Sequence, residues 1–250
     1  MQFVVDLTEL QHNSVKVAGG FGPIRYEPSQ LTWLQRPTAQ GIEVASRNFA
    51  EAMLSDQLNS AIASLVAAIE NQASATNDVS GSAGLTYNAM NDAHALFGDA
   101  SQMLETQVMT GSTAHKLLGQ ALDNGAQLFS EGTVRVIDIL GKRSVITDSP
   151  ALTAGTNKER VLALSQMAAV IASNNDFRSA IVEGTGKTRL ETTYQAEYTE
   201  NVSVKGYSWN TAVKSPVKAA LETGTNWSLV MPLKESAGVM LIGDSTKGNA

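Results

Sequence analysis

An apolar periodicity that runs for more than thirty residues constrains this chain more than any other feature. Between Thr38 and Gln72, apolar residues recur at steps of three to five; they are Ile42, Ala45, Phe49, Met53, Leu58, Ile62, Leu65 and Ile69. This spacing is typical of one face of an α-helix. Pro37 and Thr38 suit the start of such a helix. The pattern predicts one very long helix, either buried in its own domain or forming a spine that spans the molecule and touches neighbouring copies.

The residues before this helix are β-like and rich in glycine. Phe3–Val5 and Val15–Ala18 are β-type runs, Gly19–Pro23 interrupts the chain, and Ile24–Pro28 resumes it. This order predicts an extended arm followed by a hairpin with a glycine-rich tip. A two-stranded ribbon alone is only marginally stable in water. We therefore expect it to rest on a neighbouring copy, with packing on its own domain as the alternative.

After the helix the chain mixes short helices and strands. The sequence predicts a helix over Leu85–Phe97, a strand over Leu104–Met109, and a helix capped by Ser112. Alternating side chains over Thr192–Trp209 predict a long antiparallel ribbon. Further strands are predicted at 134–137, 143–147, 161–164, 168–172, 226–231 and 238–242. The whole order predicts an α+β fold.

Composition excludes several kinds of chemical site. The chain has no cysteine, so thiolate metal sites, disulfides and cysteine nucleophiles are ruled out. Its histidines, His12, His94 and His115, are far apart in the sequence. The net charge is −6, and no basic stripe suited to nucleic-acid phosphates is visible. No run of about eighteen apolar residues occurs. We therefore expect no metal, no cofactor and no membrane partner.

One segment resembles part of an enzyme motif. Gly184–Thr188 is similar to the end of a phosphate-binding loop, but Ile181 stands where the first glycine of that loop belongs. A β-like stretch follows it, whereas the motif requires a helix. No serine lies in the glycine-flanked turn of a hydrolase nucleophile. We therefore expect no catalytic residues and interpret Gly184–Thr188 as a turn in the ribbon.

Aromatic and apolar residues of the arm and the later strands are candidates for contact with other copies. Trp33, Trp209 and Trp227 each lie near the end of an element, where they either pack in the core or anchor a subunit contact. The candidate subunit-interface residues are Val15, Lys16, Phe21, Ile24, Tyr26, Trp33, Trp209 and Trp227.

Several stretches together carry a resemblance to a known family. They are Val4–Pro37, Phe97–Asp99 before Val108–Ser112, Ile139–Pro150, Gly206–Trp209, and Asn226–Trp227 with Lys234–Val239. In their order and spacing they resemble the "major capsid protein 13-like" group of tailed-phage coat proteins. The resemblance implies the Hong Kong 97-type capsid fold and a major capsid protein of the virion. Such a protein self-assembles into hexamers and pentamers of an icosahedral head that encloses double-stranded DNA.

The resemblance also implies a division of the chain. Residues 1–36 would form the N-arm and extended loop, and residues 37–84 with 176–215 the peripheral domain, which holds the spine helix and the ribbon. Residues 85–175 would form the axial domain, and residues 216–250 the closing strands and tail.

Partners follow from the same resemblance. Besides copies of itself, we expect a portal protein, a separate scaffolding protein and packaged DNA without sequence-specific contacts. Whether decoration proteins also bind is left open by the resemblance. The chain begins almost directly in the arm, so no fused scaffold is expected, and assembly would take place in the bacterial host cytoplasm. We do not predict a covalent cross-link through Lys16. An encapsulin-like compartment is the structural alternative, and an enzyme using Gly184–Thr188 is the less favoured one.

Overall fold

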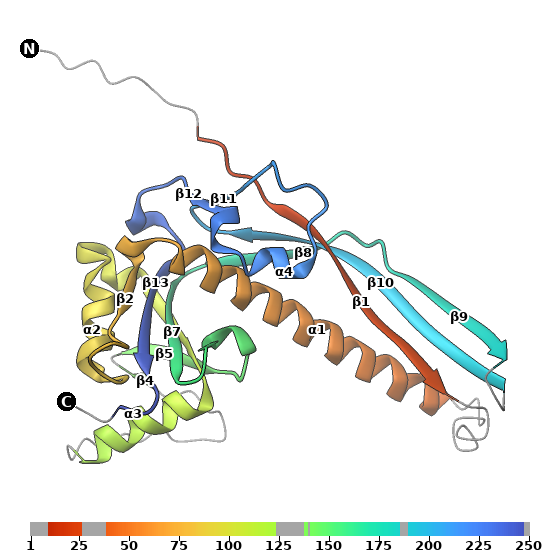
Figure 1. Cartoon of the computed structure of the whole chain (residues 1–250), viewed down its shortest axis with the longest axis horizontal. Coiled ribbons are helices and arrows are strands. Elements are labelled where there is room, and N and C mark those ends of the chain that lie inside the picture. The colour runs from red at the N-terminus through yellow and green to blue at the C-terminus, as the bar shows by residue number, and fades with distance from the viewer. Residues whose placement is uncertain (1–9, 27–38, 124–137, 140, 186–189, 248–250) are drawn as a thin grey trace, which may run out of the picture.

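The computed structural model describes residues 10–26, 39–123, 138–139, 141–185 and 190–247. It shows a compact body from which a long blade extends (Figure 1). The blade consists of the strands β1 (Val15–Tyr26), β9 (Arg178–Thr185) and β10 (Leu190–Val204), with the first half of helix α1 (Ala39–Glu70). β9 and β10 are neighbours in the sequence, but β1 and α1 are far from both, so the blade as a whole depends on tertiary pairing.

β10 is the central strand of the four-stranded blade sheet. β1 pairs antiparallel with one of its sides, while β9 and β8 (Ala169–Ser173) pair with the other. The predicted hairpin in the arm is therefore wrong, because β1 is one strand whose partner is β10. At Gly22–Pro23 the register shifts as in a β-bulge, and Gly22 has φ +98°. Glycine and proline mark both bulges and turns, so the local sequence could not separate the two.

The predicted long helix is confirmed, and its two halves have different surroundings. All side chains from Ile62 to Ile69 are buried, whereas Leu54, Ser55 and Leu58 are exposed. The buried half passes through the body, and the other half lies along the blade (Figure 1). Arg47–Glu70 is long and apolar enough to cross a membrane by length and composition. Its buried half is explained by packing inside the protein core.

A seven-stranded sheet forms the body. Its order is β2 (Thr76–Asp78), β13 (Gly238–Asp244), β7 (Lys158–Ser165), β3 (Leu104–Met109), β5 (Lys142–Ile146) and β4 (Asp138–Ile139), with β6 (Thr153–Ala154) beside β7. The strands predicted at 104–109, 143–147, 161–164, 168–172, 226–231 and 238–242 are confirmed, and that at 134–137 lies outside the described residues. β2, β3 and β13 lie in this one sheet, although the resemblance implied that they belong to three different parts of the chain.

Short helices and turns complete the body. The helices are α2 (Tyr87–Ala95), α3 (Gly111–Asp123) and α4 (Lys218–Leu221). Short 3-10 turns lie at Ala73–Ala75, Gly98–Met103, Pro150–Leu152, Gly224–Asn226 and Leu233–Glu235. The N-cap of α3 corrects the prediction of Ser112. The Thr110 hydroxyl accepts the hydrogen bond from the Thr113 backbone N–H at 3.2 Å, because the helix begins two residues earlier than a Ser112 cap implies.

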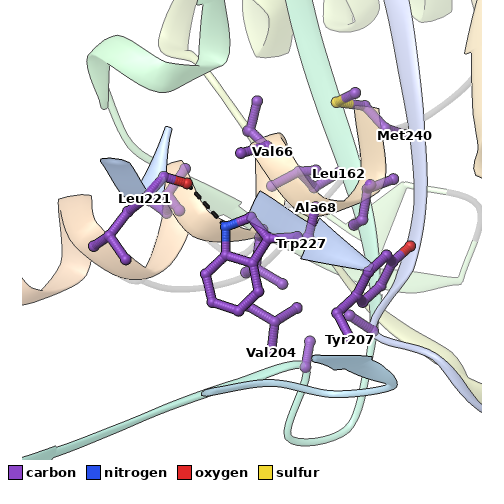
Figure 2. Packing of buried hydrophobic residues seen from close by; sticks show 14 of the residues in the cluster. Val66, Ala68, Leu162, Val204, Tyr207, Leu221, Trp227 and Met240 are labelled. Carbon is purple, nitrogen blue, oxygen red and sulfur yellow. Dashed lines mark hydrogen bonds between the residues drawn. The ribbon is translucent and has the colours of Figure 1, made fainter. Parts of the chain in front are cut away.

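Trp227 lies at the centre of the main core. It is on β12 (Trp227–Leu229), which pairs with β11 (Tyr207–Trp209). Its indole N–H donates to the backbone oxygen of Leu221 at 3.0 Å, as Figure 2 shows. Val66 and Ala68 of α1 pack in the same cluster as Leu162 and Met240 of the body sheet (Figure 2). This core therefore joins the buried half of α1 to the body sheet and to the β11–β12 pair.

Candidate subunit-contact surface

The blade sheet has one apolar face and one polar face. Ala196, Tyr198 and Val202 of β10 are buried, whereas Gln195 and Glu197, which alternate with the first two, are exposed. This alternation follows from the two-residue period of a strand. The buried side faces α1, so the opposite, polar face of the blade is open to its surroundings.

Aromatic rings attach the outer half of α1 to the sheet. The Phe49 ring of α1 packs edge to face against Phe21 of β1, with ring centroids 5.3 Å apart. It makes a second edge contact at 5.3 Å with Phe177, which precedes β9. Such geometry adds to the apolar burial of the rings. A hollow of about 210 Å³ lies beside Phe21 and Phe49 and is also lined by Met53 and Tyr198.

A charged cluster joins α1, β10 and α4. The Tyr198 hydroxyl and the Lys218 ammonium both donate to the Asp56 carboxylate. Lys218 Nζ also lies 3.8 Å from Glu200 Oε1, and the Glu200 side chain has no exposed surface. Burial, and next the hydrogen bond to Asp56, raise the pKa of the Tyr198 phenol above its ordinary value. A buried carboxylate needs such a partner, so Lys218 fixes α1 against the sheet.

Several large apolar side chains of the blade are exposed. On α1, Leu54 is 60% exposed and Leu58 is 49% exposed, and four residues apart they share one helix face. On the sheet, Ile24 is 43%, Val182 60% and Leu190 66% exposed. Scattered apolar residues on a surface need no explanation, but a group on a projecting element indicates a surface for association.

Three of the residues predicted to contact other copies are instead buried in their own chain. Val15, Trp209 and Trp227 have 3%, 5% and 0% exposure. Trp209 and Trp227 pack on each other edge to face, with ring centroids 4.9 Å apart. Residues with at most 5% exposure offer almost no side-chain surface to a second molecule, so the interface prediction is corrected for these three. For the tryptophans, the core-packing alternative holds.

The remaining predicted residues belong to the blade or lie outside the described chain. Lys16 is exposed, and its ammonium lies 3.5 Å from the Asp176 carboxylate of the same chain. Phe21 is half-buried against Phe49, and Ile24 is exposed. Trp33 and the side chain of Tyr26 are outside the described part. Lys16, Phe21 and Ile24 therefore stay candidates for contact.

Sequence reasoning missed Leu54, Val182 and Leu190, and it assigned Leu58 to the buried stripe of the helix. One signal was available, because Met53 and Leu54 are adjacent. Neighbouring helix residues point about 100° apart, so both cannot face the same sheet. No comparable signal marks Val182, since exposure at a sheet margin depends on which strands lie beside it.

Among the described residues, the enzyme-like segments do not assemble into a site, and residues 186–188 lie outside the described part of the chain. β9 ends at Thr185 and pairs antiparallel with β10 from Leu190 onward, so a strand follows the Gly184–Thr188 segment. A phosphate loop needs a helix N-terminus at that position, so this strand does not fit the motif. His94 is buried and His115 is exposed on α3. Across the described residues, no three His, Asp or Glu side chains gather in a way that could hold a metal ion.

Comparison with known proteins starts from the sequence. The model of the family described as Major capsid protein 13-like matches residues 4–240. No curated protein matches the chain at significant similarity. The family match thus covers the blade, the whole of α1 and nearly all of the body sheet.

Solved shell structures share the fold. The holo encapsulin complex of Synechococcus elongatus PCC 7942 is 11% identical, with a TM-score of 0.58 over 95% of this chain and 76% of that one. The acid-stable capsid of Helicobacter pylori bacteriophage KHP30 is 10% identical, with a TM-score of 0.54 over 98% and 82%. The capsid of cyanophage Pam1 is 13% identical, with a TM-score of 0.50 over 98% and 80%. The predicted Hong Kong 97-type α+β fold is confirmed.

Proposed function

The chain belongs to the Major capsid protein 13-like family, and we propose that it forms the hexamers and pentamers of an icosahedral phage head. As a major capsid protein it is a structural component of the virion. The observation that carries the proposal is the family match across residues 4–240. Double-stranded DNA would be the content of the head, with a portal and a separate scaffolding protein as assembly partners in the host cytoplasm. In this proposal the chain has no catalytic role.

The blade supports a division of labour within such a subunit. Residues 1–36 would form the arm and the extended loop, and residues 37–84 together with 176–215 would form the peripheral part. Residues 85–175 would form the axial part at the centre of each capsomer, and 216–250 the closing strands. Because β13 pairs with β7 and β2 pairs with β13, we would count both strands with the axial part.

Assembly through the blade needs no single strong contact. Leu54 and Leu58 on α1 and Ile24 on β1 offer separate apolar patches. When one rigid subunit engages several neighbours at once, later contacts form at a high effective concentration. Modest patches along an extended element are therefore enough to stabilise a closed shell.

Electron microscopy of the purified full-length chain, produced alone and with candidate assembly partners, tests the shell. We expect closed particles, whereas a small uniform oligomer under all conditions would contradict the proposal.

The double variant Leu54→Lys and Leu58→Lys tests the blade. Both side chains are already exposed, so the subunit should fold normally but lose most of its closed shells. Leu54→Met with Leu58→Met is the matched control, because it preserves apolar character and volume. Normal closure of the lysine variant would reject this surface.

A second candidate function is an encapsulin-like compartment of cellular origin. The observation that favours it is the TM-score of 0.58 with the Synechococcus encapsulin complex. The family match favours the phage head. Analysis of the content of native particles distinguishes the two, since a phage head holds double-stranded DNA and a compartment holds protein cargo. Genes for a terminase and a portal beside this one would also support the phage head.

A further inference from the structure

Strand β9 forms an unusually open margin of the blade. It pairs with β10 along one side, and among the described residues no strand pairs with its other side. Every side chain of β9 that the structure describes is exposed, on both faces of the strand. Figure 1 shows β9 running along the blade next to β10 and away from the body. Its free N–H and C=O groups are a template for a further strand.

The opposite margin of the blade carries features that block such pairing. β1 has a bulge at Gly22–Pro23, and Pro23 lacks a backbone N–H. The exposed Lys16 lies on the same strand. These are devices by which proteins protect sheet edges from adding strands. β9 contains no proline, and its pairing with β10 runs without a register shift from Arg178 to Thr185.

We propose that β9 pairs antiparallel with β9 of a second copy across a two-fold axis, joining two blade sheets into one. The inference rests on the proposed shell, because a closed icosahedral shell of identical chains contains two-fold axes. A contact on such an axis must be self-complementary. A two-fold axis normal to the sheet makes the two β9 strands antiparallel, so each residue of β9 meets a residue of the same strand in the second copy.

The side-chain pattern indicates where the axis passes. Val182 pairs with Thr193 on the face of the sheet that points away from α1, and it is 60% exposed. An axis normal to the sheet at Val182 places this side chain opposite its own copy and removes both from water. Ala180 then lies opposite Gly184 of the second copy. Around Gly184 a Cβ would have open space, so two strands can approach there without a clash.

Single-cysteine variants of the full chain test this arrangement, because the chain has no cysteine of its own. Directly opposed residues of antiparallel strands have Cβ atoms about 4.5–5.5 Å apart, near the range that a disulfide spans. In assembled particles under mild oxidation, Val182→Cys should give disulfide-linked dimers as the main band on a non-reducing denaturing gel. Ala180→Cys alone should give few, and Ala180→Cys with Gly184→Cys should give many.

The matched control is Ala18→Cys, an exposed position on β1 at the other margin of the same sheet. It should stay monomeric, and unassembled Val182→Cys subunits should also stay monomeric at low concentration. Closed shells in which Val182→Cys remains monomeric, or dimerises no more than Ala18→Cys, would overturn the β9 contact and leave the proposed function intact. Failure of the unmodified chain to form shells under any condition would overturn both.

Discussion

Gly19 lies directly against the ring of Tyr198 where β1 pairs with β10. A Cβ at Gly19 would stand 2.5 Å from Cζ of that ring. The Tyr198 ring therefore passes over β1 at Gly19, and its hydroxyl donates a hydrogen bond to the Asp56 carboxylate on α1. A missing side chain on one strand therefore makes room for a contact between the sheet and the helix.

Gly19→Ala should destabilise the isolated subunit by about 1–3 kcal/mol, because overpacking a fitted site displaces the neighbouring ring. Gly20→Ala is the matched control, since the nearest atom to its Cβ would be the Ala196 oxygen at 3.4 Å. Urea unfolding of both variants and of the parent measures the difference. Equal stability of the two variants would show that Tyr198 moves aside without cost.

His94 is a second residue whose surroundings predict a measurable property. It is 8% exposed, and the Gln107 side-chain amide donates to its Nε2 at 3.3 Å. Burial, and next the charge of Lys142, lower the pKa of His94 from its ordinary value of 6.5. Burial in the folded protein therefore favours the neutral form of this imidazole.

Stability should fall as the pH drops from about 7 to 5, because below the ordinary histidine pKa the unfolded chain binds a proton that the folded chain resists. The free energy of unfolding, measured by urea titration at several pH values, should lose much of this slope in His94→Gln. The exposed His115→Gln should keep it. A slope unchanged by His94→Gln would assign the acid sensitivity to other groups.

At the scale of elements, β1 is part of the core of its own chain. Val15 and Val17 are buried, and the strand pairs with β10 from Val15 to Tyr26. The Asn13 backbone oxygen also accepts a hydrogen bond from the Trp209 backbone N–H at 3.0 Å. The expectation that the arm cannot be satisfied within one subunit is therefore wrong for β1.

Deleting residues 1–36 should prevent folding of a soluble subunit, since it uncovers a whole edge of β10 and removes Val15 and Val17 from the core. The soluble fraction after expression and the circular dichroism of any soluble product measure the effect. A soluble, cooperatively folding deletion variant that merely fails to assemble would instead mean that β1 adds little to the stability of the subunit.

For the whole molecule, charge is the property that sets its relation to DNA. The net charge is −6. Several cations are also paired with carboxylates of the same chain, as Arg160 is with Glu70 and Lys234 with Asp99. Affinity for DNA depends on cations that displace counterions from phosphates. A shell wall of this composition would hold DNA by enclosure and would not bind it tightly.

Purified empty shells should therefore leave the mobility of linear double-stranded DNA unchanged at about 0.15 M salt, close to physiological ionic strength. A variant with Glu191→Lys, Gln195→Lys and Glu197→Lys on β10 is the positive comparison, because it makes one blade face basic. Retardation of DNA by the unmodified shells would contradict the prediction.

Periodicity and alternation were enough to predict the long helix, the Leu104–Met109 strand and the two-faced β10 with an α+β order. Each of these depends on the spacing of side chains within one segment, which the sequence contains in full. Tertiary structure alone decided that β1 pairs with β10 instead of folding on itself, that Trp209 and Trp227 face the core, and that no described strand pairs with the outer side of β9. For β1 the physical reason is that its partner residues in β10 lie more than 150 residues away in the sequence, so the pairing is selected by the packing of the whole chain.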